Sequence, residues 1–274
     1  MLPGIIATFL ASLEATFERF LLIGTRQNPK KVLVVQFTIV FLIMCILAPF
    51  LLEIPLMNAH YILVFAGMLI AAAFFNAFFF IGLKHVHIEK AQPLLLSNFI
   101  FTILLAIIFF PDERSPFKVF LAVVASLVLI AIHIKKHHLV FSRFELMLLG
   151  YAIMISIHNV LIKELLTIFT PFSLYFFRAG LMSILLALIF HAKLTDYKKN
   201  TRKQLLVAAT VTALNITMYW SYQVSGIVVT SLLLTASPVL AIWISRIMLK
   251  ERVHTKNVFA TLIICICISL SLLF

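Results

Sequence analysis

Several ionisable side chains interrupt long apolar stretches of this sequence. Glu14 has no basic residue within four positions, and His158 and Arg178 each lie inside an apolar run. At bilayer depth an ionisable group costs several kcal/mol unless it pairs or faces water. Each is therefore a candidate for binding a charged small molecule, and Glu14 is also a candidate proton site. For His158 the alternative is a structural hydrogen bond, and for Arg178 it is anchoring at the lipid surface.

Polar residues also recur at helical spacing. Ser156, Asn159 and Lys163 follow the pattern i, i+3, i+7, which places them on one face of an otherwise apolar helix. Glu164 is adjacent to Lys163 and points in a different direction, so the two charges do not simply neutralise each other. A polar stripe of this kind is expected to face a cavity rather than lipid.

Uncharged polar and aromatic side chains complete the candidate site. Amides bind polar ligand groups and aromatic rings bind cations and apolar surface, so together they suit a small amphiphilic ligand. The aromatic residues have a second interpretation as a belt at the membrane interface, which the sequence favours for Tyr222. The candidates are Gln36, Asn76, Asn98, Asn215, Tyr219, Trp220 and Thr235.

The composition indicates what kind of element must position these side chains. Hydrophobic residues make up 63% of the 274 residues and charged residues 12%, whereas soluble domains have about 25% charged residues. A soluble chain could not cover so much apolar surface, but lipid requires no covering. The net charge of +12 comes from basic residues in short turns between apolar runs. That placement fits membrane orientation and anionic head groups, and no basic stripe or stacking motif supports nucleic-acid binding.

Ten apolar runs are candidates for membrane spans, for which about 20 residues are needed. The connecting stretches are short, so neighbouring helices are expected to pack antiparallel, and no soluble domain is left over. The stretch 205–245 contains no Asp, Glu, Lys or Arg and is too long for one crossing, so we expect a hairpin turn at Ser225 and Gly226. The runs are 4–24, 31–52, 60–83, 90–111, 117–134, 145–168, 171–192, 203–224, 228–249 and 254–273.

The second half of the sequence repeats the first. Residues 94–114, which end in Asp-Glu-Arg, match residues 232–252, which end in Lys-Glu-Arg, at an offset of 138 positions. The match extends over 76–134 and 214–272 at the same offset, and the earlier segments match at about 142–144 positions. An internal repeat in a strongly apolar chain is typical of transporters built from two halves.

Each half contains five predicted crossings, an odd number, so the second half must enter the bilayer from the opposite side. We therefore expect an all-α membrane protein with ten transmembrane helices in two inverted repeats, residues 1–138 and 139–274, and a site between them near the midplane. Ser12 then corresponds to Ser156. The halves differ where Glu14 corresponds to His158 and Gln36 to Arg178, so we expect function at those positions.

The sequence offers no residue set for catalysis or for a cofactor. It contains no phosphate-binding glycine loop, nucleophile elbow or zinc-protease helix. The histidine pairs at 85 and 87 and at 137 and 138 lie in basic turns, which is weak evidence for a metal. The cysteines Cys45, Cys265 and Cys267 lie inside apolar runs without disulfide or metal-ligand spacing. We expect no enzyme activity, no metal and no cofactor.

A short motif near the C-terminus carries a family resemblance. Ser-Pro-Val at 237–239 is followed by Leu-Lys-Glu-Arg at 249–252 and then by an apolar segment, and residues 110–114 carry a weaker version. The chain resembles the ten-helix EamA-type members of the drug/metabolite transporter superfamily, whose pattern is a proline in mid-helix followed by a Leu-Gly-Glu-Arg corner. Lys250 and Asp112 depart from the glycine, and Ile100 replaces the first-half partner of Pro238. The two corners are expected at helix ends, where they brace the hairpins.

The resemblance implies secondary transport of a small metabolite, with lipid as the environment and protons as a candidate coupling ion. Mixed charges near the expected cavity favour a polar or zwitterionic, amino-acid-like substrate, moved across the inner membrane by alternating access. The alternative within transporters is export of organic cations or drugs, in which Glu14 and the aromatic residues would dominate. A membrane scaffold is the alternative outside transporters. The sequence does not predict the oligomeric state.

Two arguments disagree on the orientation of the chain in the membrane. The loops after the first, third, fifth, seventh and ninth predicted helices, together with the adjoining helix ends, hold 17 of the 22 Lys and Arg residues. The positive-inside rule places that side in the cytoplasm and both termini outside. The family resemblance favours termini inside, so the orientation stays open, with the charge count slightly preferred.

Overall fold

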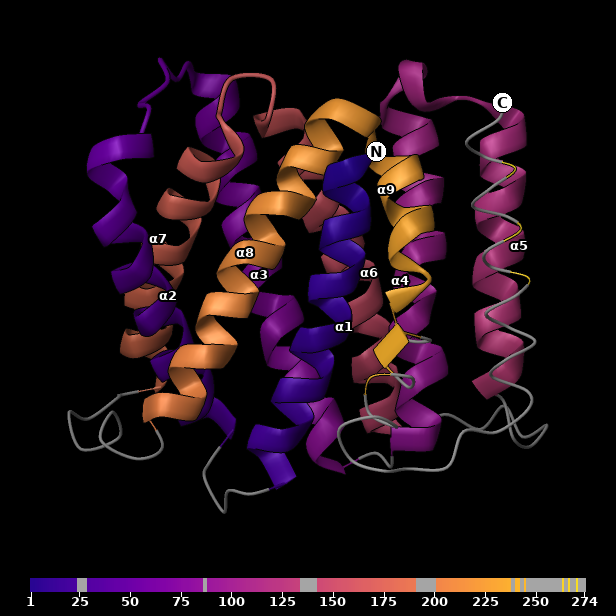
Figure 1. The fold of residues 1–274 in the computed structure, drawn as a ribbon, viewed down its shortest axis with the longest axis horizontal. Coiled ribbons are helices and arrows are strands. Elements are labelled where there is room, and N and C mark those ends of the chain that lie inside the picture. The colour runs from indigo at the N-terminus through magenta and orange to yellow at the C-terminus, as the bar shows by residue number, and fades with distance from the viewer. Residues whose placement is uncertain are drawn as a thin grey trace.

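The computed structural model describes residues 1–23, 29–85, 88–133, 142–190 and 201–237, and also the single positions 240, 241, 244, 263, 266 and 270. The described part of the chain is helical, as Figure 1 shows. Its elements are α1 (Leu2–Ile23), α2 (Pro29–Leu51), α3 (Ala59–His85), α4 (Ile88–Phe109), η1 (Pro111–Glu113), α5 (Pro116–His133), α6 (Arg143–Leu165), α7 (Pro171–Phe190), α8 (Thr201–Ser225) and α9 (Ile227–Leu234).

The expected all-α membrane architecture is confirmed. Among the described residues, five helices are long and apolar enough to cross a membrane. They are the spans Lys31–Leu51, Ala59–Phe79, Arg143–Leu165, Pro171–Phe190 and Arg202–Ser225. Shorter apolar helices cover Leu2–Glu14 and Ser97–Phe109. The predicted tenth span, 254–273, lies outside the described residues except for positions 263, 266 and 270, which are helical.

Several helices begin at residues whose chemistry favours a helix start. α2, α5 and α7 begin at Pro29, Pro116 and Pro171, where the missing N–H has no helical partner to lose. α6 begins with a capping box. The Ser142 hydroxyl accepts a hydrogen bond from the Glu145 N–H at 3.3 Å, and the Glu145 carboxylate accepts one from the Ser142 N–H at 2.6 Å.

The predicted hairpin at residues 225 and 226 is confirmed. α8 ends at Ser225 and α9 begins at Ile227. Gly226 has a φ of 84°, a left-handed conformation that glycine adopts without steric cost. A Cβ at Gly226 would also collide with the carboxylate of Glu113, so the position excludes any side chain.

The ninth predicted span, 228–249, begins with α9, which ends at Leu234, and much of the rest of that span lies outside the described residues. Thr235 and Ala236 form a turn, and helical positions resume at Ser237. Pro238 comes next in the sequence, and it has no backbone N–H to donate to the Leu234 carbonyl.

The helices pack in a crossed arrangement between the two parts of the chain. α1 packs against α8 and α9, α6 packs against α3 and α4, and α2 packs against α7. In Figure 1, α1 and α8 lie in the middle of the bundle and α2 and α7 lie together at one side. The largest buried apolar cluster includes residues from α6, α7, α8 and α9, among them Leu165, Tyr175, Tyr219 and Ile227.

Two serines tie these crossings together. The Ser12 hydroxyl on α1 lies 2.7 Å from the Thr8 carbonyl and 3.0 Å from the carbonyl of Ser237, just beyond α9. The Ser156 hydroxyl on α6 lies 2.7 Å from the Ala152 carbonyl and 2.9 Å from the carbonyl of Asn98 on α4. Small hydroxyl residues let helices approach closely and satisfy backbone groups in lipid.

Substitution of Gly180 tests the close packing that positions α7, the helix that carries Arg178. A Cβ at Gly180 would lie 2.7 Å from Cε2 of Phe41 on α2, so Gly180→Ala must displace the ring or the helix. We expect a loss of about 1–3 kcal/mol of unfolding free energy, measured by denaturant titration in detergent micelles.

Gly67→Ala is the matched control for this substitution. The Cβ added at Gly67 would make ordinary contact with Leu161, at 3.6 Å. Helix propensity then predicts a neutral or slightly stabilising change, within about 1 kcal/mol. Equal losses in the two variants would contradict the close α2–α7 packing.

Candidate substrate-binding cavity

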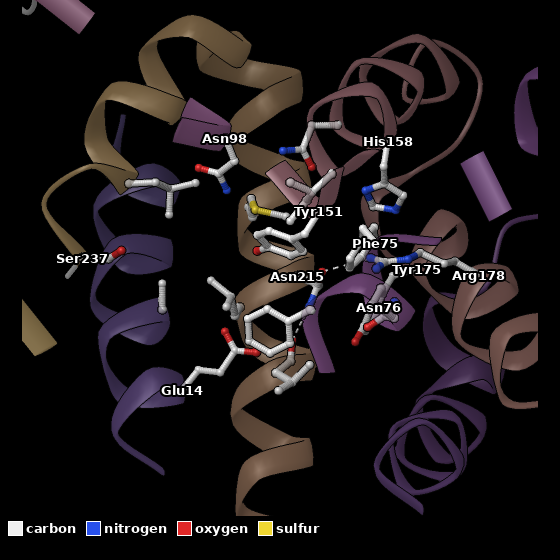
Figure 2. Close-up of a pocket in the computed structure, with 18 of the residues that line it drawn as sticks. Glu14, Phe75, Asn76, Asn98, Tyr151, His158, Tyr175, Arg178, Asn215 and Ser237 are labelled. Atoms are coloured by element: carbon white, nitrogen blue, oxygen red, sulfur yellow. Dashed lines mark hydrogen bonds between the residues drawn. The ribbon is translucent and has the colours of Figure 1, made fainter. Parts of the chain in front are cut away.

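A cavity of about 350 Å³ lies inside the bundle. Its walls come from α1, α2, α3, α4, α6, α7, α8, α9 and Ser237. Figure 2 shows charged, amide and aromatic side chains around it. Small-molecule sites typically have volumes of about 300–1,000 Å³, mostly apolar walls and a few placed polar groups. The volume therefore suits a ligand of modest size.

Arg178 on α7 provides a buried positive charge at this cavity. Its side chain is 5% exposed. The Nη1 group donates to Oδ1 of Asn215 at 3.1 Å and to the hydroxyl of Tyr219, both on α8. Nε has no hydrogen-bond partner within the described part of the chain. The guanidinium is thus held in place, and its buried Nε–H group has no acceptor among the described residues.

Tyrosine rings support this guanidinium. Cζ of Arg178 lies 5.8 Å from the ring centroid of Tyr175, one helical turn earlier on α7, within the range of a cation–π contact. The rings of Tyr175 and Tyr219 meet edge to face, with centroids 5.9 Å apart and an interplanar angle of 89°. Both tyrosines are almost fully buried. Their packing fixes the direction of Arg178 and excludes the lipid-anchor interpretation of that residue.

Glu14 on α1 brings the opposite charge to the same cavity. It lies among the lining residues and is partly buried. In Figure 2, Glu14 and Arg178 enter the cavity from opposite sides, with Asn215 and Phe75 between them in the view. A carboxylate on one wall and a guanidinium on another can bind the two ends of a zwitterion.

His158 lies in the wall of the cavity, next to Asn159 on α6. The ring is 2% exposed, and neither ring nitrogen has a partner among the described residues. Its centroid lies 5.1 Å from that of Phe75 on α3, at an interplanar angle of 68°. A buried imidazole without a partner indicates a place for a ligand atom or a water molecule.

Three amides extend this polar surface. The Nδ2 groups of Asn76 on α3 and Asn215 on α8 each donate to the carbonyl four residues earlier, at 2.8 and 2.9 Å. Oδ1 of Asn98 on α4 is buried and has no partner in the described ranges. The cavity therefore offers both a hydrogen-bond acceptor and donors.

The structure brings most of the predicted site residues to one place. These residues line the cavity: Glu14, Gln36, Asn76, Asn98, His158, Asn159, Arg178 and Asn215. Tyr219 lies behind Arg178 as its hydrogen-bond acceptor.

Four aromatic or polar residues are placed differently from the prediction. Trp220 is 48% exposed and faces away from the cavity, because it follows Tyr219 by only one position on α8. Tyr222, which the sequence assigned to the interfacial belt, is 1% exposed and lines the cavity. Thr235 is buried and donates to the Leu232 carbonyl at 2.6 Å, which satisfies the end of α9. Lys163 extends one turn past Asn159 into a second, polar pocket.

Several residues of the cavity are not among the candidates named from the sequence. Tyr151, Tyr175 and Ser237 all line it. Tyr151 precedes His158 by seven positions and Tyr175 precedes Arg178 by three, so helical spacing could have found both. Ser237 follows Leu234 by three positions and Ser231 by six, and those two residues line the cavity as well.

The Glu-Arg corner after α4 has two separate roles. Arg114 braces the end of α4 as expected, since its Nε and Nη2 groups donate to the carbonyls of Ile107 and Ile108 at 2.8 and 3.1 Å. Glu113 instead reaches α9, a contact that the sequence did not predict. The second corner, residues 250–252, lies outside the described residues. Within the described ranges, no group of three or more His, Cys, Asp and Glu residues could hold a metal.

Comparison with known proteins agrees with the fold described above. Residues 143–273 match the model of the EamA-like transporter family. Among solved structures, 28 chains match, and one, described only as the crystal structure of a protein, has a TM-score of 0.76. It is 16% identical, and the alignment covers 99% of this chain and 96% of that chain, which shows a shared fold. No curated protein matches.

The family match covers α6 to α8 and the region beyond, and the fold likeness covers nearly the whole chain. Apolar helices long enough to cross a membrane occur in both parts of it. The protein is a multi-pass membrane protein, and its second half, residues 143–273, matches the EamA-like transporter family.

Proposed function

We propose that the protein is a secondary transporter that moves a small polar or zwitterionic, amino-acid-like metabolite across the inner membrane by alternating access. The observation that carries this proposal is Arg178, a buried guanidinium at the cavity whose Nε has no partner among the described residues. A carboxylate of the substrate would accept hydrogen bonds from that guanidinium, a charge-assisted contact stronger than a neutral one.

The remaining walls fit the other parts of such a substrate. The ammonium group would face Glu14, which lies across the cavity from Arg178 in Figure 2. The aromatic rings of Phe75, Tyr151 and Tyr175 would contact its side chain. With a volume of about 350 Å³, the cavity holds a single small metabolite.

Alternating access rests on two inverted halves, residues 1–138 and 139–274, with five helices each. The packing supports this division, since α1 contacts α8 and α9 as α6 contacts α3 and α4, and α2 meets its counterpart α7. Exchanging the halves exchanges these contacts. A cavity between inverted halves can open to one face of the membrane and then to the other.

Matched hydrogen bonds support the same division. Ser12 and Ser156 each bond to the carbonyl four residues earlier and to a carbonyl on a helix of the other half. Asn76 and Asn215 each donate to the carbonyl four residues earlier and line the cavity. In a chain of unrelated helices, nothing would require these contacts to occur in matching pairs.

Protons are the proposed coupling ion, with Glu14 as the residue that exchanges them. A carboxylate inside a transporter can change its charge as the cavity opens to each face, which links proton movement to substrate movement. Export of organic cations is the second candidate function, and the aromatic rings beside Glu14 favour it. A scaffold has no use for buried polar atoms at a cavity, and those of Asn98, His158 and Arg178 argue against it.

Arg178→Gln tests the proposed carboxylate site. In proteoliposomes loaded with amino acids, we expect the rate of amino-acid exchange to fall at least about 30-fold, because a buried charged contact is lost. Arg178→Lys should also lose most activity, since an ammonium group cannot reproduce the planar fork. Arg202→Gln removes an exposed arginine of α8 and should have no effect. Undiminished exchange by folded Arg178→Gln protein would contradict the proposal.

Glu14→Gln separates the two substrate classes and tests proton coupling. For an amino-acid substrate, the variant should still exchange substrate between the two faces but should no longer accumulate it in response to a pH gradient. The measurement is uptake of labelled amino acid with and without the gradient.

The matched control is Glu164→Gln, which removes a partly exposed carboxylate that pairs with His60 at 3.4 Å. This variant should leave both substrate exchange and accumulation in response to a pH gradient unchanged. If quaternary ammonium compounds compete and amino acids do not, the cation-export alternative replaces the present proposal.

A further inference from the structure

A second polar cluster lies apart from the cavity, at the end of the bundle that contains η1. Glu113 of η1 is 8% exposed, although it is a carboxylate in the corner between two apolar helices. Its Oε1 accepts a hydrogen bond from the Ile227 N–H at 2.6 Å, and its Oε2 accepts one from the Val228 N–H at 3.2 Å. These are the first two residues of α9.

Glu113 thereby caps a helix that lies 114 positions further along the chain. The residue at the N-cap of α9 is Gly226, which has no side chain to satisfy the free N–H groups. Glu113 supplies that acceptor, and its negative charge also favours the positive end of the helix dipole. The space that a Gly226 side chain would occupy is filled by the Glu113 carboxylate.

Lys163 joins a third helix to the same cluster. Its Nζ lies 3.8 Å from Oε1 of Glu113 and donates to the Tyr222 carbonyl at 2.9 Å. The Lys163 side chain is 16% exposed, so this pair is shielded from water. Beside it, Nε2 of Gln223 donates to the Leu166 carbonyl at 3.2 Å. The ends of α6 and α8 are therefore tied to η1 and to the start of α9.

This cluster lies one helical turn from the substrate cavity on each helix. On α6, Asn159 lines the cavity and Lys163 follows four positions later. On α9, Ser231 lines the cavity and Ile227 precedes it by four positions. Tyr222 belongs to both, because its side chain lines the cavity and its carbonyl accepts from Lys163. Separating these ends would open the cavity toward the η1 face.

We infer that Glu113 and Lys163 form a polar gate that holds the cavity closed at the η1 face of the membrane and must break for the cavity to open there. This inference rests on the proposed alternation between two halves, because Glu113 belongs to the first half and its carboxylate contacts Ile227, Val228 and Lys163 of the second. Breaking the gate leaves the α9 N–H groups and the Glu113 carboxylate without these contacts, so the intact gate stabilises the closed state.

The test measures how readily a thiol in the cavity reacts from each face. Ala11→Cys places the thiol on the cavity wall, in a chain whose Cys45, Cys265 and Cys267 are changed to serine. A membrane-impermeant maleimide is added to each face in turn. Separate variants Asp112→Cys and Arg143→Cys, at exposed positions at opposite ends of the bundle, identify the faces.

Glu113→Gln should raise the labelling rate from the η1 face about fivefold, the ratio expected from losing one charged helix cap. Lys163→Met leaves the cap in place and should raise it about threefold. Asp112→Asn removes the neighbouring exposed carboxylate and should leave the rate unchanged. If Glu113→Gln does not fold, the labelling rates of Lys163→Met and Asp112→Asn are compared instead, and a higher rate in Lys163→Met alone supports the gate.

Unchanged labelling in both gate variants, or an equal rise in Asp112→Asn, would overturn the inference. Amino-acid exchange by the parent protein is measured in parallel, so that the two proposals fail separately. Labelling that responds to the gate variants in a protein that moves no amino acid supports the gate and overturns the substrate proposal. Amino-acid exchange by the parent protein, with labelling that does not respond to the gate variants, supports the substrate proposal and overturns the gate.

Discussion

Arg178 places a permanent positive charge inside a bundle of apolar helices, and much of the cavity is arranged around that charge. Burying an unpaired guanidinium costs several kcal/mol, so its neighbours must compensate. Asn215 and Tyr219 accept from one of its nitrogens, and Tyr175 lies against its plane. This compensation is incomplete at Nε within the described chain. A ligand carboxylate would complete it, which links the energetics of the buried charge to substrate binding.

The cavity and the gate use buried polar groups in different ways. At the cavity, polar atoms of Asn98, His158 and Arg178 lack partners within the described residues, so a ligand stabilises them. At the η1 face, the Glu113 carboxylate and Lys163 both have partners, so the helices themselves are stabilised. A transporter needs both kinds of group, because it must bind its cargo and also keep one face closed.

Sequence reasoning predicts well what depends on periodicity and poorly what depends on distant contacts. Apolar runs, the turn at Gly226 and the polar face of α6 follow from local patterns, and the structure contains all three. Trp220 was placed wrongly because neighbouring positions on a helix face different directions. The capping of α9 by Glu113 was missed because no local pattern connects residues that are 114 positions apart.

The central claim is that the cavity between Glu14 and Arg178 is where the substrate binds. It is tested most directly by substrate protection of thiols introduced by Asn159→Cys and Asn215→Cys, both at the cavity wall. The account predicts that both thiols react with a water-soluble maleimide. It also predicts that the transported amino acid protects them, with half-protection at the concentration that half-saturates transport in the same variant. Thiols that stay unreactive, or that react equally with and without a transported substrate, would contradict it.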